Sequence, residues 1–125
     1  MTYLDDFHGI INEFGYGPVF FFGIDDSVVN GISINPYGGL ELDNIVSSER
    51  PVIHSDVQVF IRNSSAETGF SQALNIYNKL RGTANSLIGN TFFLRIVPKA
   101  PPMFLFRTDS GNYEFSVNFS LIFRE

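Results

Sequence analysis

Two histidines and the adjacent aspartates Asp25 and Asp26 are the residues whose types could support catalysis or metal binding. His8 and His54 are far apart in the chain, and neither has acidic residues at a spacing typical of a metal site, so a surface or capping role is favoured for both. Asp25 and Asp26 carry oxygen ligands suited to a hard cation, but an adjacent pair without further acidic ligands is typical of a solvated turn. The sequence predicts no metal site.

Nucleophilic and nucleotide-binding chemistry also lack their usual signatures. The chain contains no cysteine and no G-x-S-x-G nucleophile elbow. Gly15-Tyr16-Gly17 precedes Pro18 and an apolar segment, so it cannot present a helix N-terminus to a phosphate as a dinucleotide-binding loop does. We therefore expect no catalytic residues, no cofactor and no enzymatic activity.

The composition is that of a folded domain with few surface charges. Hydrophobic residues make up 44% of the 125 residues, which excludes a disordered chain, and the length suits one domain over residues 1–125. Only 17% are charged, below the roughly 25% of an ordinary soluble domain, which hints at further burial by partner chains. No apolar run approaches the roughly 20 residues of a membrane span, so no membrane association is expected.

Charge is distributed unevenly along the chain. Residues 1–49 contain eight acidic residues and no lysine or arginine, whereas residues 50–125 contain five acidic and eight basic residues. The net charge of −5 argues against a protein that clamps nucleic acid with a basic face. The acidic N-terminal part is either a distinct electrostatic face or an ordinary solvated surface.

Hydrophobic periodicity predicts two helices and six strands. Apolar residues at helical spacing predict one helix over residues 2–14 and a second from a Ser64–Glu67 capping box to Gly82. Strands are predicted at residues 19–22, 28–35, 56–62, 91–97, 103–107 and 113–124, the first buried on both faces and the second followed by a loop through Glu49. This order predicts an α+β fold, a single domain with a mostly antiparallel or mixed sheet and two helices packed on its apolar face.

The strands at 56–62 and 113–124 alternate apolar and polar residues, so each has a dry and a wet face. We predict that the wet faces contact neighbouring copies of the chain or another protein. Phe60 is the expected anchor, because a phenylalanine on an otherwise polar face is costly to leave in water. The alternative is that a helix of the same chain covers it. The candidate interface residues, including those of the last turn, are Gln58, Phe60, Arg62, Asp109, Asn112, Ser116 and Asn118.

Several segments together resemble the tail terminator family of long-tailed bacteriophages. The segment from Asp56 to Arg62 is similar to the V-Q-V-x-V-R strand of that family, and the segment from Ala73 to Leu80 to its A-x-x-I-Y-x-x-L helix. The segment 109–119, after Pro102, resembles the family ending P…D-x-x-G-R-x-x-x-S-x-N-F, with asparagine at residue 112 where the family has arginine.

The resemblance implies a virion structural protein that forms a homo-oligomer, a hexameric ring. Such a ring binds the last ring of the major tail (tube) protein, stops tube growth and offers its other face to a neck or head-completion protein. It is then located at the head-proximal end of the tail and assembled in the host cytoplasm, and DNA passes through it without specific binding.

A ring through which DNA slides is expected to have an acidic or neutral channel, because basic residues would bind phosphates and hold the genome back. The channel candidates are Asp25, Asp26, Glu41 and Asp43. The simple alternative places the acidic residues on an outer rim, where they aid solubility. Two other functions remain open: a head-side neck or head-completion protein, and, less favoured, a small intracellular enzyme or ligand-binding domain.

Overall fold

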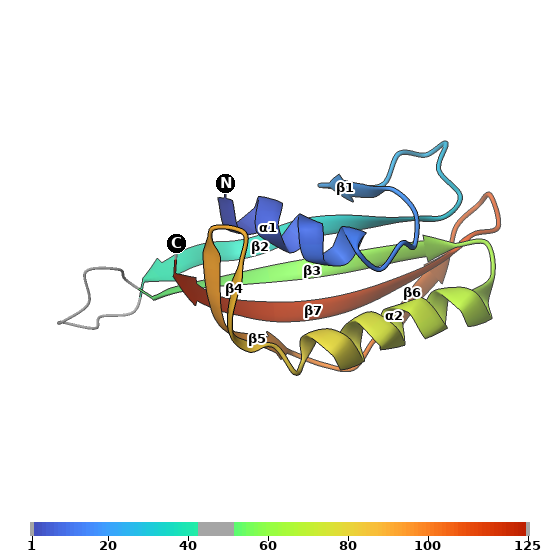
Figure 1. Cartoon of the computed structure of the whole chain (residues 1–125). Helices are drawn as coiled ribbons and strands as arrows, with labels where there is room; N and C mark the ends of the chain where they lie inside the picture. Colours follow the sequence, from blue (N-terminus) through green and yellow to red (C-terminus); the bar gives the residue numbers. More distant parts are fainter. Residues whose placement is uncertain (1, 43–51, 125) are drawn as a thin grey trace.

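A seven-stranded sheet and two helices make up the computed structural model, which describes residues 2–42 and 52–124 (Figure 1). The elements in chain order are α1 (Thr2–Asn12), β1 (Val19–Phe21), β2 (Gly31–Leu42), β3 (Ile53–Asn63), α2 (Ala66–Leu80), β4 (Ala84–Ile88), β5 (Thr91–Pro98), β6 (Met103–Arg107) and β7 (Tyr113–Arg124).

The sheet is open and mixed. Its strand order is β1-β2-β3-β7-β5-β4, and β6 pairs with β7 on the same side as β5 but nearer the start of β7. The β1–β2 pair is parallel, and the other pairs are antiparallel. Both helices pack on one face (Figure 1). The predicted α+β fold, with a mixed sheet and both helices on its apolar face, is confirmed.

The core lies between the helices and the odd-numbered residues of β3 and β7. The register sets Val57 opposite Phe119 and Val59 opposite Val117, and these four side chains are fully or almost fully buried. From α1, Phe7 packs edge-on against Phe119, with ring centroids 6.4 Å apart. The side chains that α2 buries are Ala73, Ile76 and Leu80. The apolar side chains at every second strand position and those at 3.6-residue spacing in the helices thus pack into one core.

Helix α2 begins one residue later than the predicted capping box. Asn63 accepts a hydrogen bond from the backbone N–H of Ser65 (2.9 Å), which holds Ser65 extended as the last non-helical residue. The hydroxyl of Ser65 then accepts from the N–H of Thr68 (3.2 Å), so the N-cap is Ser65 and the prediction of Ser64 is wrong. Further along, Gly69 lets the helix approach the sheet closely, since a Cβ there would lie 2.7 Å from the ring of Phe115.

Two predicted strands differ from those observed. The prediction that residues 19–22 are buried on both faces is wrong, because β1 is a three-residue edge strand and Phe21 and Phe22 are exposed. The second strand begins at Gly31 rather than at residue 28, since Val28 closes a turn onto the carbonyl of Asp25 (3.0 Å). It then continues to Leu42 through the predicted loop, because pairing with β3 resumes after an irregularity between Tyr37 and Glu41.

The hairpin of β4 and β5 is tied to α1. The carboxylate of Asp6 accepts hydrogen bonds from the N–H of Asn90 (3.1 Å) and from the hydroxyl of Thr91 (2.6 Å). Gly89, with φ of 62°, forms the turn directly beside this carboxylate, where any Cβ would overlap Asp6. Asp6 therefore fixes the hairpin against the first helix.

Candidate functional site

The face of the sheet opposite the helices collects most of the predicted interface residues. We call it the polar face: the even-numbered residues of β3 and β7 with the odd-numbered residues of β2 that pair with them. Ser33, Phe60 and Ser116 form one row across β2, β3 and β7. Asn35, Gln58 and Asn118 form the next row.

Phe60 is half-buried in this face, between two serines that are almost fully buried. The helices cover the opposite face, so its neighbours in register are strand residues. Two polar atoms beside it, Ser116 Oγ and Asn118 Oδ1, are buried without a hydrogen-bond partner among the described residues. An unpaired buried polar atom costs about 1–3 kcal/mol. The polar face therefore carries hydrogen-bonding capacity that the described part of the chain leaves unused.

Arg62, by contrast, is engaged within the chain. Its guanidinium donates to Glu114 from Nε (3.3 Å) and from Nη2 (3.2 Å), and both side chains are 12% exposed. Its Nη1 donates to the backbone carbonyls of Asp25 and Val28, each at 3.2 Å. Arg62 thus fastens the acidic turn that follows β1 to the end of the polar face.

The two turns at this end of the sheet lie close together. Asp26, Arg62 and the turn residues Thr108 to Ser110 line one shallow depression of about 400 Å³. Asp109 is exposed, whereas Asn112 is largely buried and its N–H donates to the Thr108 hydroxyl (3.0 Å). The structure therefore brings Asp26, Arg62 and Asp109 together, and Asn112 shapes the turn.

The proposed channel acids are only partly described. Asp25 and Asp26 are exposed in the turn after β1. The N–H and hydroxyl of Ser27 both donate to the Asp25 carboxylate, and these bonds lower its pKa below the ordinary value. The backbone of Glu41 pairs with His54 at the end of β2. Asp43 lies outside the described residues.

An ion pair that sequence analysis missed lies further along the polar face. Lys99 donates to one oxygen of Asp56 (2.8 Å), and the hydroxyl of Ser120 donates to the other (2.6 Å). Partial burial alone would raise the pKa of Asp56, but the bonds from Lys99 and Ser120 outweigh it and lower the pKa. The bond to Asp56 in turn raises the pKa of Lys99. The sequence pattern that could have indicated this pair is Asp56 itself, an acidic residue on the polar side of the alternating strand.

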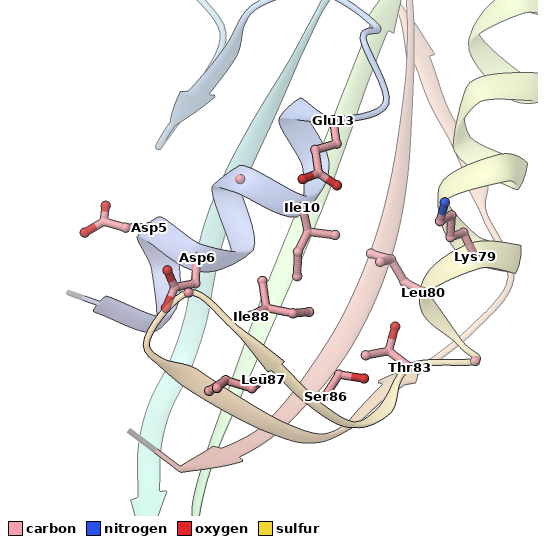
Figure 2. A pocket seen from close by; sticks show the side chains of 13 residues that line it. Asp5, Asp6, Ile10, Glu13, Lys79, Leu80, Thr83, Ser86, Leu87 and Ile88 are labelled. Carbon is pink, nitrogen blue, oxygen red and sulfur yellow. The ribbon is translucent and has the colours of Figure 1, made fainter.

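A cleft of about 670 Å³ lies on the helix side, between α1, the end of α2 and β4 (Figure 2). Ile10, Leu80 and Ile88 lie in its centre, and Asp5, Asp6 and Glu13 line the α1 wall. Asp6 is already bonded to the β4–β5 hairpin. None of the residues lining the cleft is a histidine, and His8 instead bonds the carbonyl of Val19 through Nε2 (3.0 Å). The cleft lacks a converging set of acid, base and nucleophile.

Neither a metal-binding cluster nor a membrane-spanning helix occurs in the part of the chain that the structure describes. Residues 2–42 and 52–124 contain no group of three or more histidine or acidic side chains placed to hold a metal ion. The helices in these ranges are too short or too polar to cross a bilayer.

Exposed apolar side chains gather at two edges of the sheet, a feature that sequence analysis did not single out. Eight of the ten large hydrophobic residues found exposed in the described ranges belong to them. The β1 edge comprises Phe21, Phe22 and Val29, and the β6 edge comprises Phe70, Leu74, Met103, Phe104 and Phe106. The Met-Phe-Leu-Phe run after two prolines was the available signal for the second edge.

The described residues form an open mixed sheet with both helices on one face, a polar face opposite them and two apolar edges. Comparison with known proteins gives the family of this fold. The family model described as bacteriophage tail terminator protein matches residues 10–125. The chain therefore belongs to the bacteriophage tail terminator family, whose members are structural proteins of the virion.

The fold has a counterpart among solved structures. A chain from the virion of a native gene transfer agent (GTA) particle superposes with a TM-score of 0.58 at 10% sequence identity. The match covers 86% of this chain and 78% of that chain. At this identity the likeness shows a shared fold. No curated protein sequence matches this chain significantly.

Proposed function

We propose that this protein forms a hexameric ring that caps the tail tube, stops its polymerisation and joins the tail to the neck of the filled head. The family match over residues 10–125 is the observation that carries the proposal. On this proposal the protein acts without catalysis, at the head-proximal end of a tail assembled in the host cytoplasm. Its partners are further copies of the chain, the tube protein and a neck or head-completion protein.

The polar face supplies the contacts for this role. Phe60 provides apolar area, and Gln58, Ser116 and Asn118 provide hydrogen-bonding groups around it. Among the described residues, the buried oxygens of Ser116 and Asn118 have no hydrogen-bond partner, and a partner chain that donates to them would remove the cost of burying them unpaired, which supports this assignment. Asp109 and Asn112 extend the surface to the last turn, and Arg62 shapes it by holding the turn after β1 in place.

The acidic residues of the N-terminal part face the channel in this proposal. Asp25 and Asp26 are exposed, as channel residues must be, and Glu41 and Asp43 belong to the same set. An acidic lining repels the DNA phosphates, so DNA slides through without binding specifically. Salt-sensitive binding of the isolated ring to duplex DNA would contradict this part of the proposal.

Electron microscopy of the purified protein with polymerising tail tubes tests the main role. We expect ring-shaped particles bound to one end of each tube, and tubes that stop growing when the protein is added. Leu87→Ser is a suitable control, since Leu87 is exposed on the β4–β5 hairpin, away from the polar face. A protein that binds filled heads but leaves tube growth unchanged would instead be a head-side neck protein.

A further inference from the structure

We infer that copies of this chain join head to tail through the two sheet edges, with the β6 edge of one copy packed against the β1 edge of the next. The inference rests on the proposed ring and names the surfaces that build it. A contact between two different patches is heterologous, and repeating it produces a ring when the rotation closes.

The two edges expose clustered apolar side chains, which the surface of a monomeric protein rarely does. Phe104 and Phe106 on β6 are 56% and 52% exposed, and Phe22 after β1 is 75% exposed. Phe104 and Phe70 both contact the buried Phe115, with ring centroids 5.6 and 6.0 Å apart, so Phe104 lies beside α2 on the helix side. Phe106 pairs with Glu114 in the register and lies toward the polar face, so the β6 edge is apolar on both sides. Clustered exposed aromatics mark protein interfaces, whereas single ones are common on monomers.

Phe22 gains little from its ring within the described part of the chain, where that ring contacts the ring of the exposed Phe21 at 6.4 Å between centroids. Its φ is 62°, in the left-handed region that bulky residues avoid, and its side chain is largely in solvent. Glycine or asparagine would suit the backbone better and expose less apolar surface. A strained, exposed phenylalanine is accounted for if a neighbouring copy covers it.

The edges are level with each other across the sheet. One row of paired residues runs from Val19 on β1 to Phe104 on β6, and the next runs from Phe20 to Met103. Both strands pair on one side only, β1 with β2 and β6 with β7. Among the described residues, the outer edge of β6 carries unpaired backbone groups at this height, whereas on β1 the carbonyl of Val19 is already bonded to His8 (3.0 Å), so fewer groups stay open there.

The strand directions also fit. Following the pairings from β1 to β6, one parallel and three antiparallel, leaves β6 running opposite to β1. A second copy placed beside the first in the same orientation would set its β1 antiparallel to the β6 edge. Antiparallel pairing is slightly the more stable arrangement per residue, so lateral repetition extends the sheet favourably.

The charges around the two edges are opposite. Residues 13–30, which contain β1 and its turns, have three acidic residues and no lysine or arginine. Residues 95–107, which lead into and form β6, have three basic residues and no acidic one, and of these Lys99 is paired with Asp56 within the chain. Opposite charges around an apolar centre steer docking and fix register, so this pairing favours edge-to-edge contact over contact between two identical edges.

Mixing two single-edge variants tests the inference. Phe22→Ser disables the β1 edge and Phe106→Ser disables the β6 edge, and each alone should raise the concentration needed for assembly about tenfold or more. The mixture should yield a one-to-one dimer by sedimentation, because each variant keeps the edge that the other lacks. Circular dichroism and melting of both variants check that the fold is kept, and Leu87→Ser should assemble like the wild type.

Charge reversal gives a second test that leaves the exposed phenylalanines in place. Arg107→Glu and Glu13→Lys should each weaken assembly, and a chain carrying both should recover it. Because Arg107 lies over the ring of Tyr113, circular dichroism must show that its variant keeps the fold. Rings that persist in both single-edge variants, or variants whose mixture stays monomeric, would overturn the edge contact while leaving the proposed capping role intact. Wild-type protein that stays monomeric even on tail tubes would overturn the ring itself, and with it both proposals.

Discussion

The two faces of the central strands differ in how completely the chain closes them. On the helix side, alternate residues of β3 and β7 pack against α1 and α2 and are nearly inaccessible. On the polar face, Phe60 is half-buried and the oxygens of Ser116 and Asn118 lack partners in the described residues. One face thus accounts for folding of the single chain, and the other keeps surface for assembly.

A matched pair of phenylalanine substitutions should separate these roles with the largest effect. Phe119 is fully buried and touches Phe7, so Phe119→Ala should lower the free energy of unfolding by about 3–5 kcal/mol. Phe60→Ser on the opposite face should leave a folded monomer while weakening ring formation or tube capping. Denaturant unfolding and electron microscopy of both variants measure the difference. If Phe60→Ser unfolds the monomer, Phe60 belongs to the core.

Removing Arg62 should show that part of the polar face is structural. Arg62→Met leaves the carboxylate of Glu114, which is 12% exposed, without its cation and frees the turn at residues 25–28. We expect a loss of about 2–3 kcal/mol in unfolding free energy, somewhat below that of a fully buried pair. The variants E114Q and R62M/E114Q complete a double-mutant cycle, and we expect the double variant to lose less than the sum of the two single losses. Losses that simply add would show that the pair itself contributes little.

Two glycines test the tie between α1 and the β4–β5 hairpin. Gly89→Ala forces a side chain into positive φ beside Asp6 and should cost about 1–2 kcal/mol. Gly9 lies within α1 with open space around it, so Gly9→Ala should instead stabilise the protein by about 0.5–1 kcal/mol. Thermal unfolding of the two variants gives opposite shifts in Tm. A Gly89→Ala variant as stable as the wild type would mean that the β4–β5 turn can shift away from Asp6 with little loss of free energy.

Sequence patterns predicted those elements whose periodicity agrees with their packing. The alternation in β7 and β3 and the apolar spacing in α2 each indicate the buried side directly, and both strands and the helix were found close to the predicted bounds. Strand β4 was missed, because Ala84 to Ile88 shows no regular alternation and its side chains are exposed or half-buried. It forms a strand because it pairs with β5.

Sequence patterns could not predict burial that depends on residues far away along the chain. The apolar run at residues 19–22 resembles a buried strand, but its position at the sheet edge leaves Phe21 and Phe22 exposed. Among the candidate interface residues, alternation placed Gln58, Phe60, Ser116 and Asn118 on wet faces, but only the register of β3 against β7 sets them side by side. The bonds that occupy Arg62 reach a turn more than thirty residues earlier, which no local pattern indicates.

The pH dependence of the Asp56–Lys99 pair should be the smallest effect and a test of how exposed the polar face is. The pKa of Asp56 is lowered from its ordinary value of 3.8 in the folded chain, so its stabilising contribution is complete above that value and is lost as the pH falls through the lowered pKa. The pKa of Lys99 is raised from 10.5, so its contribution is complete below that value and is lost as the pH rises through the raised pKa. Because the Lys99 side chain is 42% exposed and that of Asp56 32%, solvent screening limits the pair to about 0.5 kcal/mol. Asp56→Asn should therefore lower the unfolding free energy slightly at pH 7 and have no such effect at pH 2, whereas Asp109→Asn controls for loss of an exposed carboxylate. A loss at pH 7 of several kcal/mol, measured by denaturant unfolding, would mean that this part of the polar face is covered in the folded protein.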